Sequence, residues 1–442
     1  MTESLLPTVS AAPEKLVIEK LVYGGDGLAR IQEADGRAKT VFVPFVLPGE
    51  AVEAAVGEQK KGFFRAGLER VLVASKARID PPCPYYLRCG GCHYQHAAYE
   101  TQLKLKSDIL RETLERGARV SFQDEIRLHR SPAFEYRNRT RLHVQTAPEF
   151  RIGYFRYASH ELLAIRSCPI SSPLINRAIA SFWELDTEVP SGLNEIEFFA
   201  NERDDQLLLE LYIAPETDLD KLKRLGRKLA EHLPQLVGVS SFAQSPGKRY
   251  LAPQDPALLN GMLAIKYHTR FAAYTVSAGS FFQTNRFLID TLVEIVTGDR
   301  KGTLALDLYA GVGLFSLVLT QRFEQVIAVE PAAASGRDLE ANAVPNLKIS
   351  RQTTESFLAK SSRAIQPELI VVDPPRSGLG ERVTDLLGRT SAQELVYVSC
   401  DPATLARDLK ALIGQGWNFR ELNLIDLFPQ TFHIETVTVL KR

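Results

Sequence analysis

Short apolar runs that each end in a polar residue are the clearest pattern in the last third of the chain. The run Leu369–Val372 is followed directly by Asp373, and the run Leu395–Ser399 is followed directly by Cys400. Runs of this kind are typical of strands that are buried on both faces of a parallel sheet. Functional side chains in such sheets gather at the carboxyl ends of the strands. We therefore expect Asp373 and Cys400 to lie at one edge of a parallel sheet.

Two earlier strand patterns enclose a glycine loop. The first begins at Leu304 and leads into Tyr-Ala-Gly-Val-Gly, and the second, Val326–Val329, is followed by Glu330. The glycines allow the backbone to approach a ligand, and a carboxylate at the second strand end can accept hydrogen bonds from ribose hydroxyls. A dinucleotide fingerprint needs a third glycine, but Ser316 stands at that position. A helix is predicted just upstream, over Arg286–Val296.

The first two thirds of the chain have other patterns. Evenly spaced strands with glycine turns over residues 14–75 predict a small β-barrel. An amphipathic helix is predicted over residues 99–119. Beyond it the chain alternates strand patterns with helices, which predicts a mixed α+β region without an evident catalytic constellation. Its clearest elements are Glu195–Phe199, Leu207–Ile213 and the helix Leu219–His232.

Composition places the chain among ordinary globular proteins. It has 442 residues, of which 45% are hydrophobic and 24% charged, and its formal net charge is zero. This length predicts two or three domains. No apolar run approaches the ~20 residues that span a bilayer, and Met1–Pro13 lacks the features of a signal peptide. We therefore expect a cytoplasmic protein with no membrane partner.

Charge is distributed unevenly, with a concentration of arginines between residues 127 and 156. Aromatic residues are interleaved with them, and basic side chains contact phosphates while aromatic rings stack on unpaired bases. This pattern favours an RNA-binding surface. A solvated strand face whose arginines pair with acidic residues elsewhere is an equally good interpretation. The seven arginines are Arg127, Arg130, Arg137, Arg139, Arg141, Arg151 and Arg156.

Four of the five cysteines precede the last third. Cys83, Cys89 and Cys92 follow a Cys-x5-Cys-x2-Cys spacing, and Cys168 lies further along the chain. Two thiolates two residues apart can reach one metal centre. Four thiolates suit either zinc or an iron–sulfur cluster, so the number of ligands does not decide between them. Because proline follows both Cys83 and Cys168, we expect a 4Fe–4S cluster with a structural role.

With these motifs the whole chain, from residue 14 to 442, resembles the RNA 5-methyluridine (uracil-C5) methyltransferases. The resemblance rests on Ser-Phe-Phe-Gln-Thr-Asn, Asp-Pro-Pro-Arg, Val-Ser-Cys-Asp-Pro, the terminal His-Ile-Glu-Thr-Val and the four cysteines. It implies an α/β fold with a class I S-adenosylmethionine-dependent, Rossmann-like methyltransferase domain at residues 266–442. An OB-like TRAM barrel would occupy residues 14–75, although a barrel with an ordinary charged loop is an alternative. A central α+β domain with the iron–sulfur cluster and RNA contacts would occupy residues 76–265.

The resemblance also implies roles for individual residues. C5 of uracil is a poor nucleophile, and addition of a thiolate to C6 activates it. Cys400 is the residue implied for this addition, although a buried structural cysteine is the commoner case for this residue type. Glu435 is implied as the base that later removes the C5 proton. The residues implied to contact S-adenosylmethionine are Gln283, Tyr309, Glu330 and Asp373.

The resemblance points to a substrate as well. Relatives that act on transfer RNA generally lack both the TRAM domain and the cluster, so a monomer acting on 23S ribosomal RNA is implied, with transfer RNA as the alternative. Two other classes of protein compete with this interpretation. The first is an amino-methylating enzyme, which needs no cysteine nucleophile, so Cys400 counts against it. A non-catalytic RNA-binding or redox-sensing protein leaves the cofactor motifs and the Cys400–Glu435 pair unexplained.

Overall fold

The computed structural model describes residues 13–32, 36–60, 62–119, 126–244 and 255–442, which divide into two compact units. The first unit comprises Met1–Arg111, Tyr154–Ile165 and Phe428–His433, and the second comprises Glu112–Gly153, Arg166–Leu427 and Ile434–Arg442. The three domains expected from the sequence stay a prediction. Among the described residues, no helix is both long enough and apolar enough to cross a membrane.

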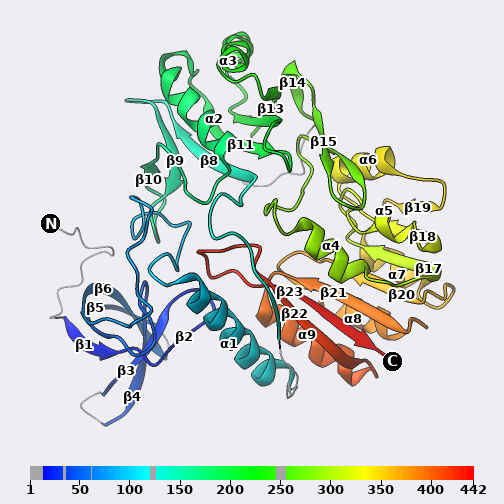
Figure 1. Cartoon of the computed structure of the whole chain (residues 1–442), viewed down its shortest axis with the longest axis horizontal. Helices are drawn as coiled ribbons and strands as arrows, with labels where there is room; N and C mark the ends of the chain where they lie inside the picture. Colours follow the sequence, from blue (N-terminus) through cyan, green and yellow to red (C-terminus); the bar gives the residue numbers. More distant parts are fainter. Residues whose placement is uncertain (1–12, 33–35, 61, 120–125, 245–254) are drawn as a thin grey trace. The chain divides into compact units, whose positions relative to one another are not determined.

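A curled six-stranded sheet forms the N-terminal part of the first unit, where the strand pattern predicted a small β-barrel (Figure 1). The strands at its opposite edges, β1 and β2, are separated along the chain only by Ile18 and Glu19. Ile18 N–H donates to the carbonyl of Glu50, and Glu19 N–H donates to that of Leu28. The residues between β1 and β2 therefore bond to the residue that precedes β5 and to β3. In sheet order the strands are β1 (Glu14–Val17), β5 (Ala51–Lys60), β6 (Phe63–Val73), β4 (Ala38–Val43), β3 (Gly27–Gln32) and β2 (Lys20–Leu21).

Buried polar side chains organise the segment that follows this sheet. Glu50 is fully buried and accepts hydrogen bonds from the Leu47 and Ser75 amides and from the Arg78 guanidinium, at 2.8, 3.1 and 2.6 Å. Burial raises the pKa of Glu50, but these hydrogen bonds outweigh it and hold the pKa below its ordinary value. Next along the chain is α1 (Tyr99–Ala118), which confirms the predicted helix and belongs to this unit as far as Arg111. The short strand β10 (Leu162–Ala164) belongs to this unit as well.

A mainly antiparallel sheet forms one part of the second unit. It confirms the predicted mixed region, with β12 and α3 at their predicted bounds and β11 extended at both ends. In α3, Leu222, Leu225 and Leu229 recur at helical spacing and are buried, while Asp218 caps the amino end. The strands are β8 (Arg139–Gln145), β9 (Arg151–Phe155), β11 (Leu193–Ala200), β12 (Leu207–Ile213), β13 (Leu236–Ala243) and β14 (Ala257–Gly261). Nearby elements are α2 (Pro173–Glu184), the short η1 (Asp186–Glu188), α3 (Leu219–His232) and the hairpin β15 (Ala264–His268) and β16 (Ala273–Ser277).

The other part of the second unit is an eight-stranded sheet with the order β19-β18-β17-β20-β21-β23-β22-β7. Its first five strands are parallel, and β23 runs antiparallel to β21 and β22. All four residues of β20 are buried, as its unbroken apolar run predicted. The strands are β19 (Leu347–Ser350), β18 (Phe323–Val329), β17 (Gly302–Leu308), β20 (Leu369–Val372), β21 (Glu394–Ser399), β23 (Glu435–Lys441), β22 (Asn418–Ile425) and β7 (Arg127–His129).

Helices alternate with these strands, which confirms the predicted α/β class. The prediction of the first helix was wrong at its start, because α4 begins at Ile289 and not at Arg286. The Arg286 amide donates to the carbonyl of Tyr136 and the Phe287 amide to the side chain of Asn285, so both amides bond outside the helix. The helices are α4 (Ile289–Thr297), α5 (Ser316–Leu319), α6 (Ala333–Asn342), α7 (Thr354–Ser361), α8 (Gly380–Gly388) and α9 (Pro402–Gly414).

Candidate functional site

Five of the residues singled out in the sequence lie at one edge of the eight-stranded sheet. The strands β17, β18, β20 and β21 are parallel neighbours (Figure 1), so their carboxyl ends meet there. The residues that directly follow these strands are Tyr309, Glu330, Asp373 and Cys400. Glu435 opens the antiparallel β23, and because Ser399 pairs with Thr436, the register places Glu435 opposite Cys400.

Acidic groups surround the thiol at this edge. Burial, and after it the charges of Glu435 and Asp373, raise the pKa of Cys400 to about 12, and Arg376 acts in the opposite direction. Glu435 is 5% exposed, and burial together with Asp373 raises its pKa well above the ordinary value, again opposed by Arg376. Without a ligand, the site therefore holds Cys400 as the thiol and favours the protonated form of Glu435.

The loop that carries Arg376 is attached to α9. The Thr404 hydroxyl donates to the Arg376 carbonyl at 3.2 Å, and the Arg407 guanidinium donates to the Ser377 carbonyl at 2.8 Å. The buried Asp408 carboxylate accepts from the Leu379 amide at 2.7 Å. Because α9 begins just after Cys400, one helix fixes both the Asp-Pro-Pro-Arg loop and the end of the cysteine strand.

The glycine loop after β17 lies beside Glu330. The two carboxylate oxygens of Glu330 accept from the amides of Gly311 at 2.9 Å and Ala332 at 2.7 Å. A carboxylate offers about four acceptor positions, so two remain for a ligand. Gly311 has a φ of +56°, and no atom lies within 4 Å of the position that a Cβ would take there. The loop is therefore open to a ligand next to a carboxylate with spare acceptors.

The charge balance of this region fits a cationic ligand. Burial raises the pKa of Asp307 to about 7, and burial together with Asp307 raises that of Asp373 to about 7. Asp307 is fully buried, and its Oδ1 has no hydrogen-bond partner among the described residues. Arg351 opposes the rise that burial causes in the pKa of Glu330. The buried carboxyl groups of Asp307 and Glu330 would favour a positively charged ligand such as a sulfonium group.

The other two predicted cofactor contacts come from different segments. Tyr309 has a φ of +65°, a conformation that non-glycine residues adopt rarely and often at functional sites. Burial raises the pKa of Tyr309, while the nearby Thr354 opposes the rise. Gln283 is 8% exposed and follows Phe282, whose ring packs on Tyr267 with centroids 4.6 Å apart. Both side chains are therefore in ordered, largely buried surroundings.

The four cysteines of the predicted cluster are divided between the two units. Cys83, Cys89 and Cys92 belong to the first unit and Cys168 to the second. The side chain of Asn176 holds the backbone at Cys168, accepting from its amide at 2.8 Å and donating to its carbonyl at 3.0 Å. Among the residues that the structure describes, no three histidine, cysteine, aspartate or glutamate side chains are grouped to hold a metal ion. The cluster therefore stays a prediction.

The arginine-rich stretch differs from its expected role at several positions. The expectation of a phosphate contact is wrong for Arg139, which is buried and ion-paired with Glu197 and Glu210. Acidic partners were the alternative interpretation, and they are present at Arg139 and at four other arginines of the stretch. These other pairs are Arg127–Glu421, Arg141–Glu195, Arg141–Glu197, Arg151–Glu149 and Arg156–Glu161.

The buried pairs were detectable only in part from the sequence. Arg139 and Arg141 are two residues apart on one strand, and Glu195 and Glu197 are two residues apart on another. Such spacing places each pair on one face of its strand, but nothing in the sequence sets the register that aligns β8 with β11.

Comparisons with known proteins give a family and relatives. The family model described as tRNA (Uracil-5-)-methyltransferase matches residues 98–442. An uncharacterized RNA methyltransferase of Aquifex aeolicus is 35% identical over 97% of this chain and 98% of its own. The 23S rRNA (uracil(1939)-C(5))-methyltransferase RlmD of Pseudomonas putida is 32% identical over 97% of this chain and 93% of its own.

A solved structure has the same fold along almost the whole chain. It is the tRNA (uracil-54, C5)-methyltransferase of Pyrococcus abyssi in complex with S-adenosyl-L-homocysteine. The TM-score is 0.75 at 23% identity, and the match covers 97% of this chain and all of the other. At this identity the likeness concerns the fold.

Proposed function

The chain belongs to the tRNA (uracil-5-)-methyltransferase family, and we propose on this basis that it transfers a methyl group from S-adenosylmethionine to C5 of a uridine in RNA. The observation that carries the proposal is the pairing of Cys400 with Glu435 across β21 and β23. Tyr309, Glu330 and Asp373 stand at the ends of neighbouring strands. Neither an amino-methylating enzyme nor a non-catalytic RNA-binding protein requires a thiol and a carboxyl group in this arrangement.

In the proposed reaction, Cys400 acts first. Once the Cys400 thiol has given its proton to water, its sulfur adds as the thiolate to C6 of the uracil ring, and the electron pair of the C5–C6 double bond moves toward C5 and the C4 carbonyl. The resting pKa of about 12 keeps the thiol protonated until substrate and cofactor are in place. Arg376 is the cation that favours the thiolate, because it lowers the pKa of Cys400.

Glu435 completes the reaction. The bound cofactor supplies the methyl group that becomes attached to C5. The Glu435 carboxylate then takes the proton from C5, the C5–C6 double bond forms again, and the bond between sulfur and C6 breaks. Because the pKa of Glu435 is raised, it is a stronger base than an exposed glutamate once it is ionised. Replacing Glu435 should therefore block release of the RNA rather than its capture.

The cofactor contacts proposed for this chain are Gln283, Tyr309, Glu330 and Asp373. Two spare acceptor positions on Glu330 suit the two ribose hydroxyls, and its contact with the Gly311 amide fixes the glycine loop beside that sugar. Asp307 and Asp373 give the acidic surroundings that a positively charged sulfonium group requires. These assignments are supported by the strand-end geometry and by the acceptor positions that Glu330 keeps free beside the glycine loop.

We propose 23S ribosomal RNA as the substrate. The relative named as a 23S rRNA methyltransferase aligns over nearly its whole length, and the N-terminal curled sheet suits an OB-like TRAM domain at residues 14–75. Transfer RNA is the alternative, because the family model and the solved structure carry transfer-RNA names. Mass spectrometry of nucleosides from a deletion strain separates the two. Loss of 5-methyluridine from 23S rRNA supports the proposal, and loss from transfer RNA alone refutes this choice of substrate.

We also propose the 4Fe–4S cluster on Cys83, Cys89, Cys92 and Cys168, supported by their spacing and by the prolines that follow two of them. No step of the proposed reaction depends on it. Anaerobically purified protein should contain about four irons per chain, as one cubane requires. Stoichiometric zinc without iron would reject the assignment.

A further inference from the structure

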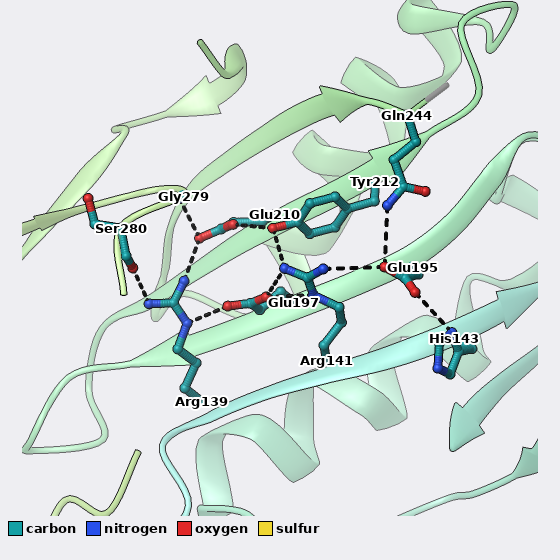
Figure 2. Close-up of polar contacts among 10 residues, drawn as sticks. All are labelled: Arg139, Arg141, His143, Glu195, Glu197, Glu210, Tyr212, Gln244, Gly279 and Ser280. Carbon is teal, nitrogen blue, oxygen red and sulfur yellow. Dashed lines mark hydrogen bonds and ion pairs between the residues drawn. The ribbon is translucent and has the colours of Figure 1, made fainter. Parts of the chain in front are cut away.

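Buried ion pairs connect three strands in the antiparallel part of the second unit (Figure 2). The Arg139 guanidinium lies between the carboxylates of Glu197 and Glu210, and its contact with Glu210 measures 3.2 Å. Arg139 comes from β8, Glu197 from β11 and Glu210 from β12. The Arg139 side chain is 10% exposed and that of Glu210 is 1% exposed. Charges taken this far from water are costly unless they are fully paired and hydrogen-bonded, so the other hydrogen bonds of these groups help to stabilise them.

Two of these charged residues also hold a loop. Glu210 accepts a hydrogen bond from the amide of Gly279 at 3.0 Å, and Arg139 donates to the carbonyl of Ser280. Figure 2 shows both contacts converging on this segment. They fix the N–H of Gly279 and the C=O of Ser280, which belong to the peptide groups on either side of the Gly279–Ser280 pair. Gln283 follows three residues later.

The far side of the same loop is fixed as well. The Asn138 amide donates to the carbonyl of Thr284 at 3.0 Å, and the Asn285 side chain donates to the Ser131 hydroxyl at 2.9 Å. Between the two anchored ends, Phe282 is buried against Tyr267. Residues 279–285 are therefore held at both ends, and the buried charges hold the end that precedes Gln283.

We propose that Arg139 and Glu210 are positioning residues for cofactor binding, which act by fixing the Gly279–Ser280 turn so that Gln283 meets S-adenosylmethionine. The inference rests on the proposed function, in which Gln283 is a cofactor contact. It accounts for a buried charge cluster that neither the reaction nor RNA binding uses. It also gives Arg139 a role inside the protein in place of the RNA contact that the sequence suggested.

The test measures binding of S-adenosylhomocysteine and S-adenosylmethionine to the full chain by calorimetry. Glu210→Gln should weaken binding ~10-fold, since a hydrogen bond to a charged group contributes enough for a change of this order. The matched control is Glu195→Gln, which removes a carboxylate from the outer part of the network. Glu195 contacts Arg141, His143 and Gln244 but not the Gly279–Ser280 turn, so its replacement should leave cofactor affinity within about twofold of the original.

A double-mutant cycle distinguishes positioning from general stability. In a Gln283→Ala background, Glu210→Gln should add less than about twofold, because both changes remove the same contact. Effects that multiply would overturn the proposal, and so would unchanged affinity in Glu210→Gln. If Glu210→Gln does not fold, Arg139→Lys takes its place, since lysine keeps the charge but its single nitrogen cannot reach Glu197, Glu210 and Ser280 at once. For Arg139→Lys, unchanged cofactor affinity, or an effect that multiplies with that of Gln283→Ala, would likewise overturn the proposal.

Amide hydrogen exchange separates failure of this inference from failure of the proposed function. Faster exchange across residues 279–284 in Glu210→Gln supports positioning, and unchanged exchange refutes it, whatever the ligand does. If Gln283→Ala binds the cofactor as well as the original chain, the assigned cofactor contact is wrong.

Discussion

Chemical modification of Cys400 tests the electrostatics of the site. A thiol with a pKa of about 12 is ~10⁻⁴ ionised at pH 8, whereas an ordinary cysteine with a pKa of ~8.5 is about one quarter ionised. The more basic thiolate is more nucleophilic, which recovers roughly one and a half powers of ten. Cys400 in the ligand-free protein should therefore react with iodoacetamide ~10²-fold more slowly than an ordinary exposed cysteine.

The pH dependence of this reaction is more decisive than its absolute rate. Mass spectrometry of the peptide that contains Cys400 gives its rate separately from the other cysteines. The rate should rise about tenfold per pH unit from pH 7 to about pH 9.5 without a plateau, because the thiol stays mostly protonated throughout. A plateau near pH 8 to 9 would contradict the claim that burial, Glu435 and Asp373 raise this pKa.

Glu435→Gln tests one of the named causes. Above the pKa of Glu435 the variant lacks a negative charge beside the thiol, so Cys400 should react up to ~10-fold faster, because Glu435 supplies a smaller part of the rise in the pKa of Cys400 than burial does. At lower pH Glu435 is already neutral, and the two proteins should react alike. Glu421→Gln, on the neighbouring β22, is the matched control and should change nothing. Equal rates for all three proteins at every pH would show that Glu435 does not raise the pKa of Cys400.

Three further predictions follow from the same residues. Incubated with RNA and S-adenosylmethionine, Glu435→Gln should accumulate a denaturation-resistant complex with methylated RNA, whereas Cys400→Ala should form none; normal turnover in Glu435→Gln would reject the base. Asp307 has a folded pKa of about 7 against an ordinary 3.8, so the native state binds more protons and the free energy of unfolding should fall by up to ~4 kcal/mol as pH rises from about 4 to about 7. In urea titrations at several pH values, Asp307→Asn should reduce this fall in the free energy of unfolding with pH. The same fall in the variant would contradict the raised pKa of Asp307. Deleting residues 1–75 should weaken RNA binding and reduce its salt dependence while cofactor affinity stays unchanged; equal RNA affinity would assign the curled sheet another role.

The sequence predicted the sheet edge well because a parallel sheet imposes the arrangement. Each strand is buried on both faces and is therefore apolar throughout. The first polar residue after the apolar run then marks the carboxyl end of the strand, as at Asp373 and Cys400. The position of Glu435 could not be predicted from an apolar run in this way. Only the antiparallel pairing of β23 with β21 places it opposite Cys400, and the sequence reached it through resemblance alone.

The roles of charged residues were harder to predict. Arg139 and Arg141 have the same spacing and chemistry as phosphate-binding residues, yet the register of β8 against β11 places acidic partners beside them. Register depends on packing across the whole sheet and is not written in any short stretch of sequence. The raised pKa of Cys400 is also a tertiary property, since burial and two carboxyl groups from other strands produce it.

The central claim, methylation of uracil C5 in RNA, is tested most directly by incubating the purified chain with trideuteromethyl S-adenosylmethionine and undermodified 23S rRNA. Nucleoside mass spectrometry then locates the label, with transfer RNA transcripts and the Cys400→Ala protein as controls. We predict labelled 5-methyluridine from 23S rRNA with the original chain and none with Cys400→Ala. Label on any other nucleoside, or labelled 5-methyluridine from the Cys400→Ala protein, would contradict the account.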